Sequence, residues 1–221
     1  MSWFKKKTYP DFWNDYAACF KTRSTQDIYE RRFVVFDTET TGLDPKTDRV
    51  LSIGCVAVLN LRVQVADQLE CYVVQEVFNS ETVKIHGLLK EGALNKITEE
   101  EATRQFLAYV QDAVLVAHHA GFDVAMINGA LKRQGLPKLK NKVIDTGYLF
   151  QKTELDTRAQ HFGLDALAKR FSIPLHDRHT ASGDAYITAL LFLKILSVLS
   201  KNRSRPLPID DLIRVNRVGL I

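Results

Sequence analysis

The order of apolar segments along the chain constrains its fold most strongly. Three short runs rich in β-branched residues follow one another at Arg32–Asp37, Arg49–Asn60 and Arg62–Gln75. Asn60 lies in a tight connection between the second run and the third. Alternating apolar residues bounded by such a connection are typical of paired strands. These runs therefore predict a three-stranded antiparallel meander.

Helical and strand-like segments alternate in the rest of the chain. Thr98 and Glu101 form a capping-box pattern, which predicts the start of a helix that runs to Val110. Apolar runs predict strands at 113–119 and 142–146, and helical patterns predict helices at 123–133, 164–171 and 181–199. A meander followed by this alternation predicts an α/β domain of three layers, in which helices flank a mixed central sheet.

The length of 221 residues suits one domain with two extensions. We expect an aromatic helical extension at 1–30, a main domain at 31–200 and a tail at 201–221 that packs back or contacts a second copy. The extension carries aromatic residues at helical spacing: Tyr9, Phe12, Trp13, Tyr16 and Phe20. This stripe either docks on the core of the domain or offers a surface to a partner or nucleic acid.

Charge and cysteine content leave several settings open. Lys and Arg total 30 against 26 Asp and Glu, and a net charge of +4 permits a nucleic-acid partner without arguing for one. Cys19, Cys55 and Cys71 show neither disulfide nor zinc spacing, and we expect the last two to be buried thiols in a cytoplasmic protein. The N-terminus lacks a clean apolar signal region. We interpret the apolar segment 185–199 as a core helix rather than a membrane span.

The residues that can carry chemistry are acidic side chains near the ends of predicted elements. Asp37 and Glu39 lie two apart on a strand and face the same way, so a cation or a proton must compensate their repulsion. Asp123 opens a predicted helix, and His179 precedes Asp184 near the start of another. Each of these alone has an ordinary explanation as a solvated or helix-starting residue. Together, four carboxylates indicate an oxygen cage for two hard divalent cations, and such ions hold both oxygens of a phosphodiester displacement.

Three segments in this order resemble the motifs of a known enzyme family. FDTETTGL, AHHAGFD and HTASGD are similar to the three motifs of the DnaQ-like DEDDh 3′→5′ exonucleases, over a span from about Arg32 to Leu199. The pattern His-x-Ala-x-x-Asp places the chain in the histidine branch of that family. The resemblance implies an RNase H-like fold and two Mg²⁺ or Mn²⁺ ions. It also implies that the metal ligands are Asp37, Glu39, Asp123 and Asp184, and that the general base is His179.

The resemblance also nominates residues that hold the terminal nucleotide. These candidates are Thr40, Thr41, Gly42 and Leu43 after the first motif, Ile85 and His86 in a KIHGL segment, and Phe122 beside the second motif. For Leu43, Ile85 and Phe122 a place in the core is the alternative, and for His86 a loop position. One departure stands out, because His119 replaces the asparagine that the family usually carries, whereas His118 matches the family and is expected to be structural.

Three functions follow from this pattern. The first is removal of nucleotides from the 3′ end of nucleic acid that is mainly single-stranded, and we expect this polymer to be DNA. This function belongs to replication or repair, and a polymerase or another replication or repair protein is a candidate partner. The second is trimming of RNA 3′ ends, because no residue decides how the 2′ position is treated. The third is a non-catalytic binding module, which the presence of all five motif residues disfavours.

Overall fold

The computed structural model describes residues 8–22, 25–76, 94–156, 162–201 and 207–213. Six strands in these ranges form one mixed sheet in the order β4-β3-β2-β1-β5-β6. The strands are β1 (Phe33–Thr40), β2 (Val50–Leu59), β3 (Arg62–Val73), β4 (Lys96–Ile97), β5 (Val114–Ala117) and β6 (Val143–Asp145). The antiparallel pairs β1–β2 and β2–β3 confirm the predicted meander, and β5 and β6 continue the sheet in parallel from β1.

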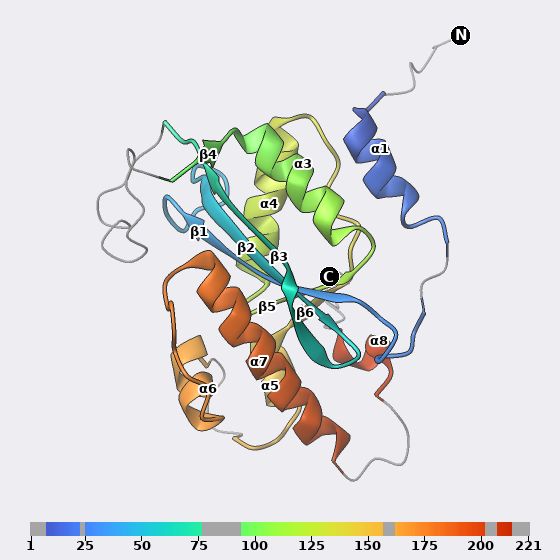
Figure 1. Cartoon of the computed structure of the whole chain (residues 1–221), viewed down its shortest axis with the longest axis vertical. Coiled ribbons are helices and arrows are strands. Elements are labelled where there is room, and N and C mark those ends of the chain that lie inside the picture. Colours follow the sequence, from blue (N-terminus) through green and yellow to red (C-terminus); the bar gives the residue numbers. More distant parts are fainter. Residues whose placement is uncertain (1–7, 23–24, 77–93, 157–161, 202–206, 214–221) are drawn as a thin grey trace, which may run out of the picture.

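Helices cover both faces of this sheet (Figure 1). They are α1 (Asp11–Ala18), α3 (Glu99–Val110), α4 (Gly121–Arg133), α5 (Thr146–Gln151), α6 (Leu164–Arg170), α7 (Ala181–Ser200) and α8 (Ile209–Leu212). In the same view the sheet runs diagonally, with α3 and α4 on one side of it and α7 on the other (Figure 1). The architecture is therefore the predicted three-layer α/β arrangement. The short helix α5 and the two-residue strand β4 were not predicted, because neither is long enough to show a period.

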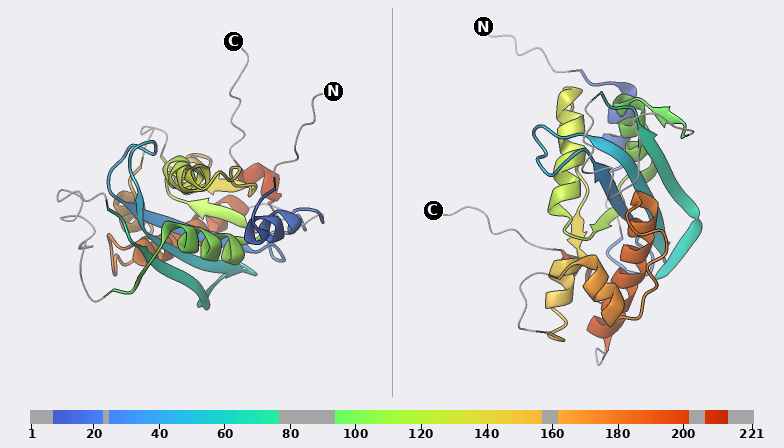
Figure 2. Two further views of the ribbon diagram at one scale, coloured as in Figure 1. Left: turned by 90° about the horizontal axis from the view of Figure 1, so that it is seen from above. Right: turned by 90° about the vertical axis from the view of Figure 1, so that its left-hand side faces the viewer.

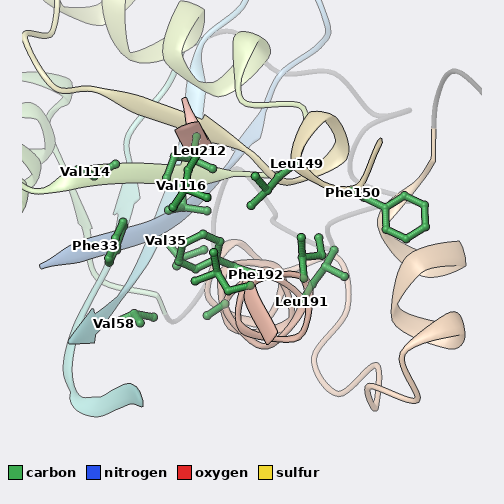
Figure 3. Close-up of a cluster of buried hydrophobic side chains, with 14 of the residues drawn as sticks. Phe33, Val35, Val58, Val114, Val116, Leu149, Phe150, Leu191, Phe192 and Leu212 are labelled. Atoms are coloured by element: carbon green, nitrogen blue, oxygen red, sulfur yellow. The ribbon is translucent and has the colours of Figure 1, made fainter. Parts of the chain in front are cut away.

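The central strand β1 is buried on both faces because each face lies under a helical layer. Phe33 and Val35 join the core beneath α7, whereas Val34 and Phe36 join the core beneath α3 and α4. Successive side chains of a strand point to opposite faces, so one apolar run contributes residues to both cores. Figure 3 shows the first core, in which Phe33 and Val35 lie close to Phe192 of α7.

Helix α7 is long and apolar enough to cross a membrane by length and composition alone. More than half of that segment is nevertheless buried inside the protein, 56% of it. Ile187, Leu191 and Ile195 contribute to the core under the sheet. The helix is the predicted core helix, since a membrane span would not need this packing.

Both ends of the described chain pack onto the domain. Trp13 and Tyr16 of α1 are buried in the core beneath α3, and the Tyr16 hydroxyl donates to Asn141 Oδ1 at 2.6 Å. The aromatic stripe therefore docks on the core of its own domain, as the first of the two interpretations predicts. Leu207, Ile209 and Leu212 pack into the other core, so this part of the tail folds back on the domain.

Candidate active site

Strand β1 places two acidic side chains under the start of α7. Asp37 and Glu39 continue the row of Phe33 and Val35, which faces α7. Both carboxylates are half-buried. The two side chains point to the same face, as predicted, because residues two apart on a strand share a face.

Helix α7 brings the third carboxylate to this row. Thr180 caps the helix, because its hydroxyl accepts from the backbone N–H of Gly183 at 3.1 Å, and Asp184 follows in the first turn. The start of α7 lies directly on Gly54 of β2, where an added Cβ would come within 2.2 Å of the Ala181 carbonyl carbon. Gly54 is the strand partner of Asp37. The absence of a side chain at Gly54 therefore lets α7 approach closely enough to set Asp184 beside Asp37.

The three carboxylates form one compact group. Single oxygen atoms of Asp37, Glu39 and Asp184 all lie within 4.8 Å of one another. Asp184 is only 5% exposed, and its Oδ1 is buried without a hydrogen-bond partner among the described residues. A buried oxygen normally has a partner, so this atom indicates a ligand. Oxygen donors at this separation fit a hard divalent cation such as Mg²⁺ or Mn²⁺.

The electrostatics of the group agree with that interpretation. Burial raises the pKa of Asp37 well above its usual range, and repulsion from Asp123, Asp184 and Glu39 raises it further. Burial and the nearby Asp184 raise the pKa of Glu39 to about 7. A raised pKa favours the protonated form of a carboxylate, whereas a divalent cation binds the ionised form. Cation binding at this site is therefore coupled to proton release.

Asp123 lies next to this group but is held from the other side of β1. The backbone N–H of Thr38 donates to Asp123 Oδ1 at 3.0 Å, and the Thr38 hydroxyl donates to the same oxygen at 2.7 Å. Burial raises the pKa of Asp123 to about 7, and these hydrogen bonds oppose the rise. Asp123 is 3% exposed and lies outside the compact group of three oxygens. The structure therefore brings the fourth predicted carboxylate to the site with one oxygen already engaged.

Arg178 is a residue of the site that the sequence analysis missed. Its guanidinium donates to Asp184 Oδ2 and, at 2.6 Å, to Asp165 Oδ1. This cation opposes the rise that burial causes in the pKa of Asp184. A basic residue directly before the motif histidine was a visible signal, but surface arginines are too common for the sequence to single it out.

His179 lies in the loop before α7, in the place that the sequence predicts. Its side chain is exposed to solvent, and its backbone takes a left-handed conformation with φ of 67°. Its Nδ1 lies 3.5 Å from Nη1 of Arg178. A water molecule can therefore reach the imidazole ring beside Asp184.

The loop after β1 contains four of the nominated substrate residues. The Thr40 hydroxyl donates to the Gly42 carbonyl at 2.8 Å, and the Thr41 hydroxyl donates to Asp48 Oδ1 at 2.8 Å, so both side chains shape the loop. Gly42 packs against the Asp48 carboxylate, where a Cβ would lie 2.5 Å away. Leu43 is 85% exposed, which excludes the alternative that it belongs to the core.

The other nominated residues have different outcomes. Phe122 is partly buried against the core beneath α3 and α4. This packing supports the alternative that Phe122 belongs to the core. Ile85 and His86 lie outside the described residues. The nucleotide-binding roles of Thr40, Thr41, Gly42 and Leu43 and of the KIHGL segment stay predictions.

The two histidines of the second motif have distinct surroundings. His118 Nδ1 lies 2.9 Å from the Thr146 hydroxyl and its Nε2 lies 2.8 Å from the Phe162 carbonyl, so this ring is tied into the structure as expected. Burial lowers the pKa of His118 to about 4. His119 has a φ of 58°, a left-handed conformation in which asparagine and histidine are both enriched. The replacement of asparagine therefore keeps a residue type that tolerates this turn.

The comparisons with known proteins come from sequence and from structure. The model of the exonuclease family RNase_T matches residues 34–192. The PolC-type DNA polymerase III of Caldanaerobacter subterraneus subsp. tengcongensis is 35% identical over 181 residues, which is 81% of this chain and 13% of that protein. The corresponding protein of Staphylococcus saprophyticus is 33% identical over 174 residues, 78% of this chain and 12% of that protein. The chain thus spans about an eighth of these relatives.

Solved structures show the same fold at low identity. The nuclease domain of 3′hExo, a DEDDh family member bound to rAMP, superposes with a TM-score of 0.67 at 14% identity and covers 77% of this chain and 94% of that one. Exonuclease X in complex with 5′-overhanging duplex DNA has a TM-score of 0.58 at 23% identity, with coverage of 75% and 91%. Exonuclease I of E. coli with a dT13 oligonucleotide has a TM-score of 0.63 at 16% identity, with coverage of 79% and 42%.

The mixed sheet with its flanking helices is thus an RNase H-like fold. The match to the exonuclease family assigns the chain to the nucleases. The family match covers the whole span of the three motifs. The chain belongs to the DnaQ-like DEDDh exonuclease family.

Proposed function

We propose that this chain removes nucleotides one at a time from the 3′ end of single-stranded nucleic acid, mainly DNA, with two divalent cations, Mg²⁺ or Mn²⁺. The observation that carries the proposal is the compact group of Asp37, Glu39 and Asp184, with a buried Asp184 oxygen that lacks a protein partner. A binding module has no need to gather like charges in this way, because doing so destabilises the fold.

Each carboxylate has a distinct part in this proposal. Asp37, Glu39 and Asp184 would hold the cations, together with the oxygen of Asp123 that Thr38 does not engage. Once bound, the two cations would stabilise the attacking and leaving oxygens of an in-line displacement. Thr38 keeps Asp123 oriented for this task, since both of its donors converge on one oxygen.

His179 would act as the general base. Its exposed imidazole lies beside Asp184, where one ring nitrogen can accept a proton from the attacking water. The terminal nucleotide would lie against the loop Thr40–Leu43, where exposed Leu43 offers an apolar surface for a base. Phe122, and Ile85 and His86 from the KIHGL segment, complete the proposed nucleotide pocket.

The biological setting is proposed from the relatives. The PolC-type polymerases that this chain resembles are DNA polymerases by name, which supports a role in DNA replication or repair and an association with a polymerase. The three thiols are free, which supports a cytoplasmic setting. An exoribonuclease role is the alternative, supported by the likeness to the 3′hExo domain bound to rAMP.

Single substitutions at the site test the proposal. Asp184→Asn should keep the fold but weaken Mn²⁺ binding and abolish hydrolysis, because it removes the negative charge of the carboxylate whose buried oxygen is the proposed ligand. His179→Ala should bind Mn²⁺ nearly as wild type does while turnover falls about 10²- to 10⁴-fold, the usual contribution of a general base. Calorimetry measures binding, and release of mononucleotide measures turnover. Near-normal turnover of His179→Ala would remove this residue from the role of base.

A further inference from the structure

A basic groove runs beside the active site between α4 and the loop that joins β1 to β2. It has a volume of about 580 Å³. The right-hand view of Figure 2 shows this loop next to α4. Five lining residues are basic and none is acidic: Lys46, Arg49, Lys132, Arg133 and Lys138. The whole chain has only four more basic than acidic residues, so the groove concentrates positive charge on one surface.

Four of these five cations make no ion pair within the described ranges, and three of the four are exposed lysines. Glu99 holds Arg133 in an ion pair at 2.5 Å, and Arg49 donates to the Thr47 carbonyl at 2.6 Å. Lys46, Lys132 and Lys138 are exposed and make no ion pair there. Their charges are therefore available to an anionic ligand.

Both walls of the groove continue into the active site. The loop that carries Lys46 begins with Thr41, directly after the strand of Asp37 and Glu39. The helix wall begins at Gly121, two residues before Asp123. A polymer whose end lies at the carboxylates can therefore reach the groove at the Gly121 end of α4. Small residues also line the wall of α4, where Gly129 lies against the Pro45 carbonyl with little space for a side chain.

We propose that this groove binds the phosphodiester backbone of the substrate strand upstream of its 3′ end. Lysine ammonium groups bind phosphate as point charges and do not read sequence, which suits an enzyme that must advance over every sequence. From Gly121 to Lys132 the helix rises by about 17 Å, at 1.5 Å per residue. That length matches about five phosphates at the ~3.4 Å spacing of a stacked strand. This inference rests on the proposed nuclease function.

The test compares two double variants. Lys132→Ala/Lys138→Ala removes two groove charges, and Lys169→Ala/Lys194→Ala removes two exposed charges on α6 and α7, across the sheet from the groove. Affinity for a fluorescent single-stranded oligonucleotide is measured by anisotropy in Ca²⁺ at increasing salt. Two lost phosphate contacts should flatten the slope of log affinity against log salt by about 1.4. Between 50 and 200 mM salt, wild type and the control should therefore lose about sevenfold more affinity than the groove variant.

A second readout separates this inference from the nuclease proposal. Hydrolysis of the p-nitrophenyl ester of thymidine 5′-monophosphate needs the carboxylates but no upstream phosphate, so the groove variant should hydrolyse it at the wild-type rate. If neither the wild type nor either double variant hydrolyses the ester or the oligonucleotide, the nuclease proposal fails. The anisotropy measurement still shows whether the groove binds the strand. An unchanged salt slope in the groove variant would overturn the inference and leave the groove to an acidic segment of a protein partner.

Discussion

Gly54→Ala should slow the reaction about 100-fold without changing any proposed catalytic group. The added Cβ would lie 2.2 Å from the Ala181 carbonyl carbon and 2.3 Å from the Ser182 nitrogen, whereas ordinary contacts begin at 3.4 Å. These are backbone atoms, so no rotation of a side chain can relieve the clash. The start of α7 must therefore move away by about 1 Å, and Asp184 moves with it.

The size of the effect follows from that displacement. Overpacking of this kind costs about 1–3 kcal/mol, which lowers Tm by roughly 2–12 °C for a chain of this length. A shift of about 1 Å in a catalytic constellation costs about 100-fold in rate. We therefore expect a folded protein with a lowered Tm, weaker Mn²⁺ binding and about 100-fold slower release of nucleotides.

The matched control is Gly163→Ala, because a Cβ there meets nothing within 4 Å. It should retain activity and lose only a small part of its stability. Circular dichroism and calorimetry report folding and metal binding, and 5′-labelled single-stranded DNA reports turnover. Full activity of Gly54→Ala would refute the argument that the contact between α7 and β2 positions Asp184.

Three further predictions concern charge and packing. In chelator, Tm should rise as pH falls from 7 toward 4.5, because the folded-state pKa of Glu39 is raised to about 7 and the stability that its proton contributes is lost as pH rises through that value. Glu39→Gln should flatten this dependence of Tm on pH. The Mn²⁺ affinity of the wild type should fall over the same acidic range. Arg178→Gln should tighten Mn²⁺ binding severalfold in a calorimetric titration, because the guanidinium competes with the cation for the Asp184 carboxylate. Exposed Arg104→Gln is the control. Weaker binding would instead show that Arg178 orients Asp184 as a ligand. Trp13→Ala should destabilise the protein by about 3–5 kcal/mol in thermal or denaturant unfolding, because its side chain is only 4% exposed and lies in the core. Exposed Asn14→Ala should have little effect. Unchanged stability of Trp13→Ala would favour the alternative that α1 offers a surface to a partner.

Periodicity and capping made much of the fold predictable. The alternation in β1 correctly places Asp37 and Glu39 on one face, and the Thr98 pattern places the start of α3, where the Thr98 hydroxyl accepts from the Glu101 N–H at 3.1 Å. These features are local, so a single sequence carries them. The same local rule could not show that Thr38, between the two acids, holds Asp123 from the opposite face.

The remaining features of the site depend on contacts between distant segments. Gly54 is one glycine in an apolar strand, and its role is visible only when α7 lies on it. Arg178 and Asp165 are separated by 13 residues, and the groove joins a loop near residue 46 to a helix that ends at Arg133. Such contacts follow from the tertiary packing, which neither propensity nor spacing determines.

The most direct test of the account is a time course on 5′-labelled single-stranded DNA and RNA of one sequence, with Mg²⁺, Mn²⁺ or chelator, beside the Asp37→Ala variant. We predict ladders that shorten from the 3′ end only with metal and wild-type protein, faster on DNA than on RNA. Faster shortening of RNA would make the chain an exoribonuclease. Persistent shortening in chelator or in Asp37→Ala would contradict the proposed metal-dependent mechanism, and intact substrate with folded wild-type protein and either metal would contradict the proposed activity.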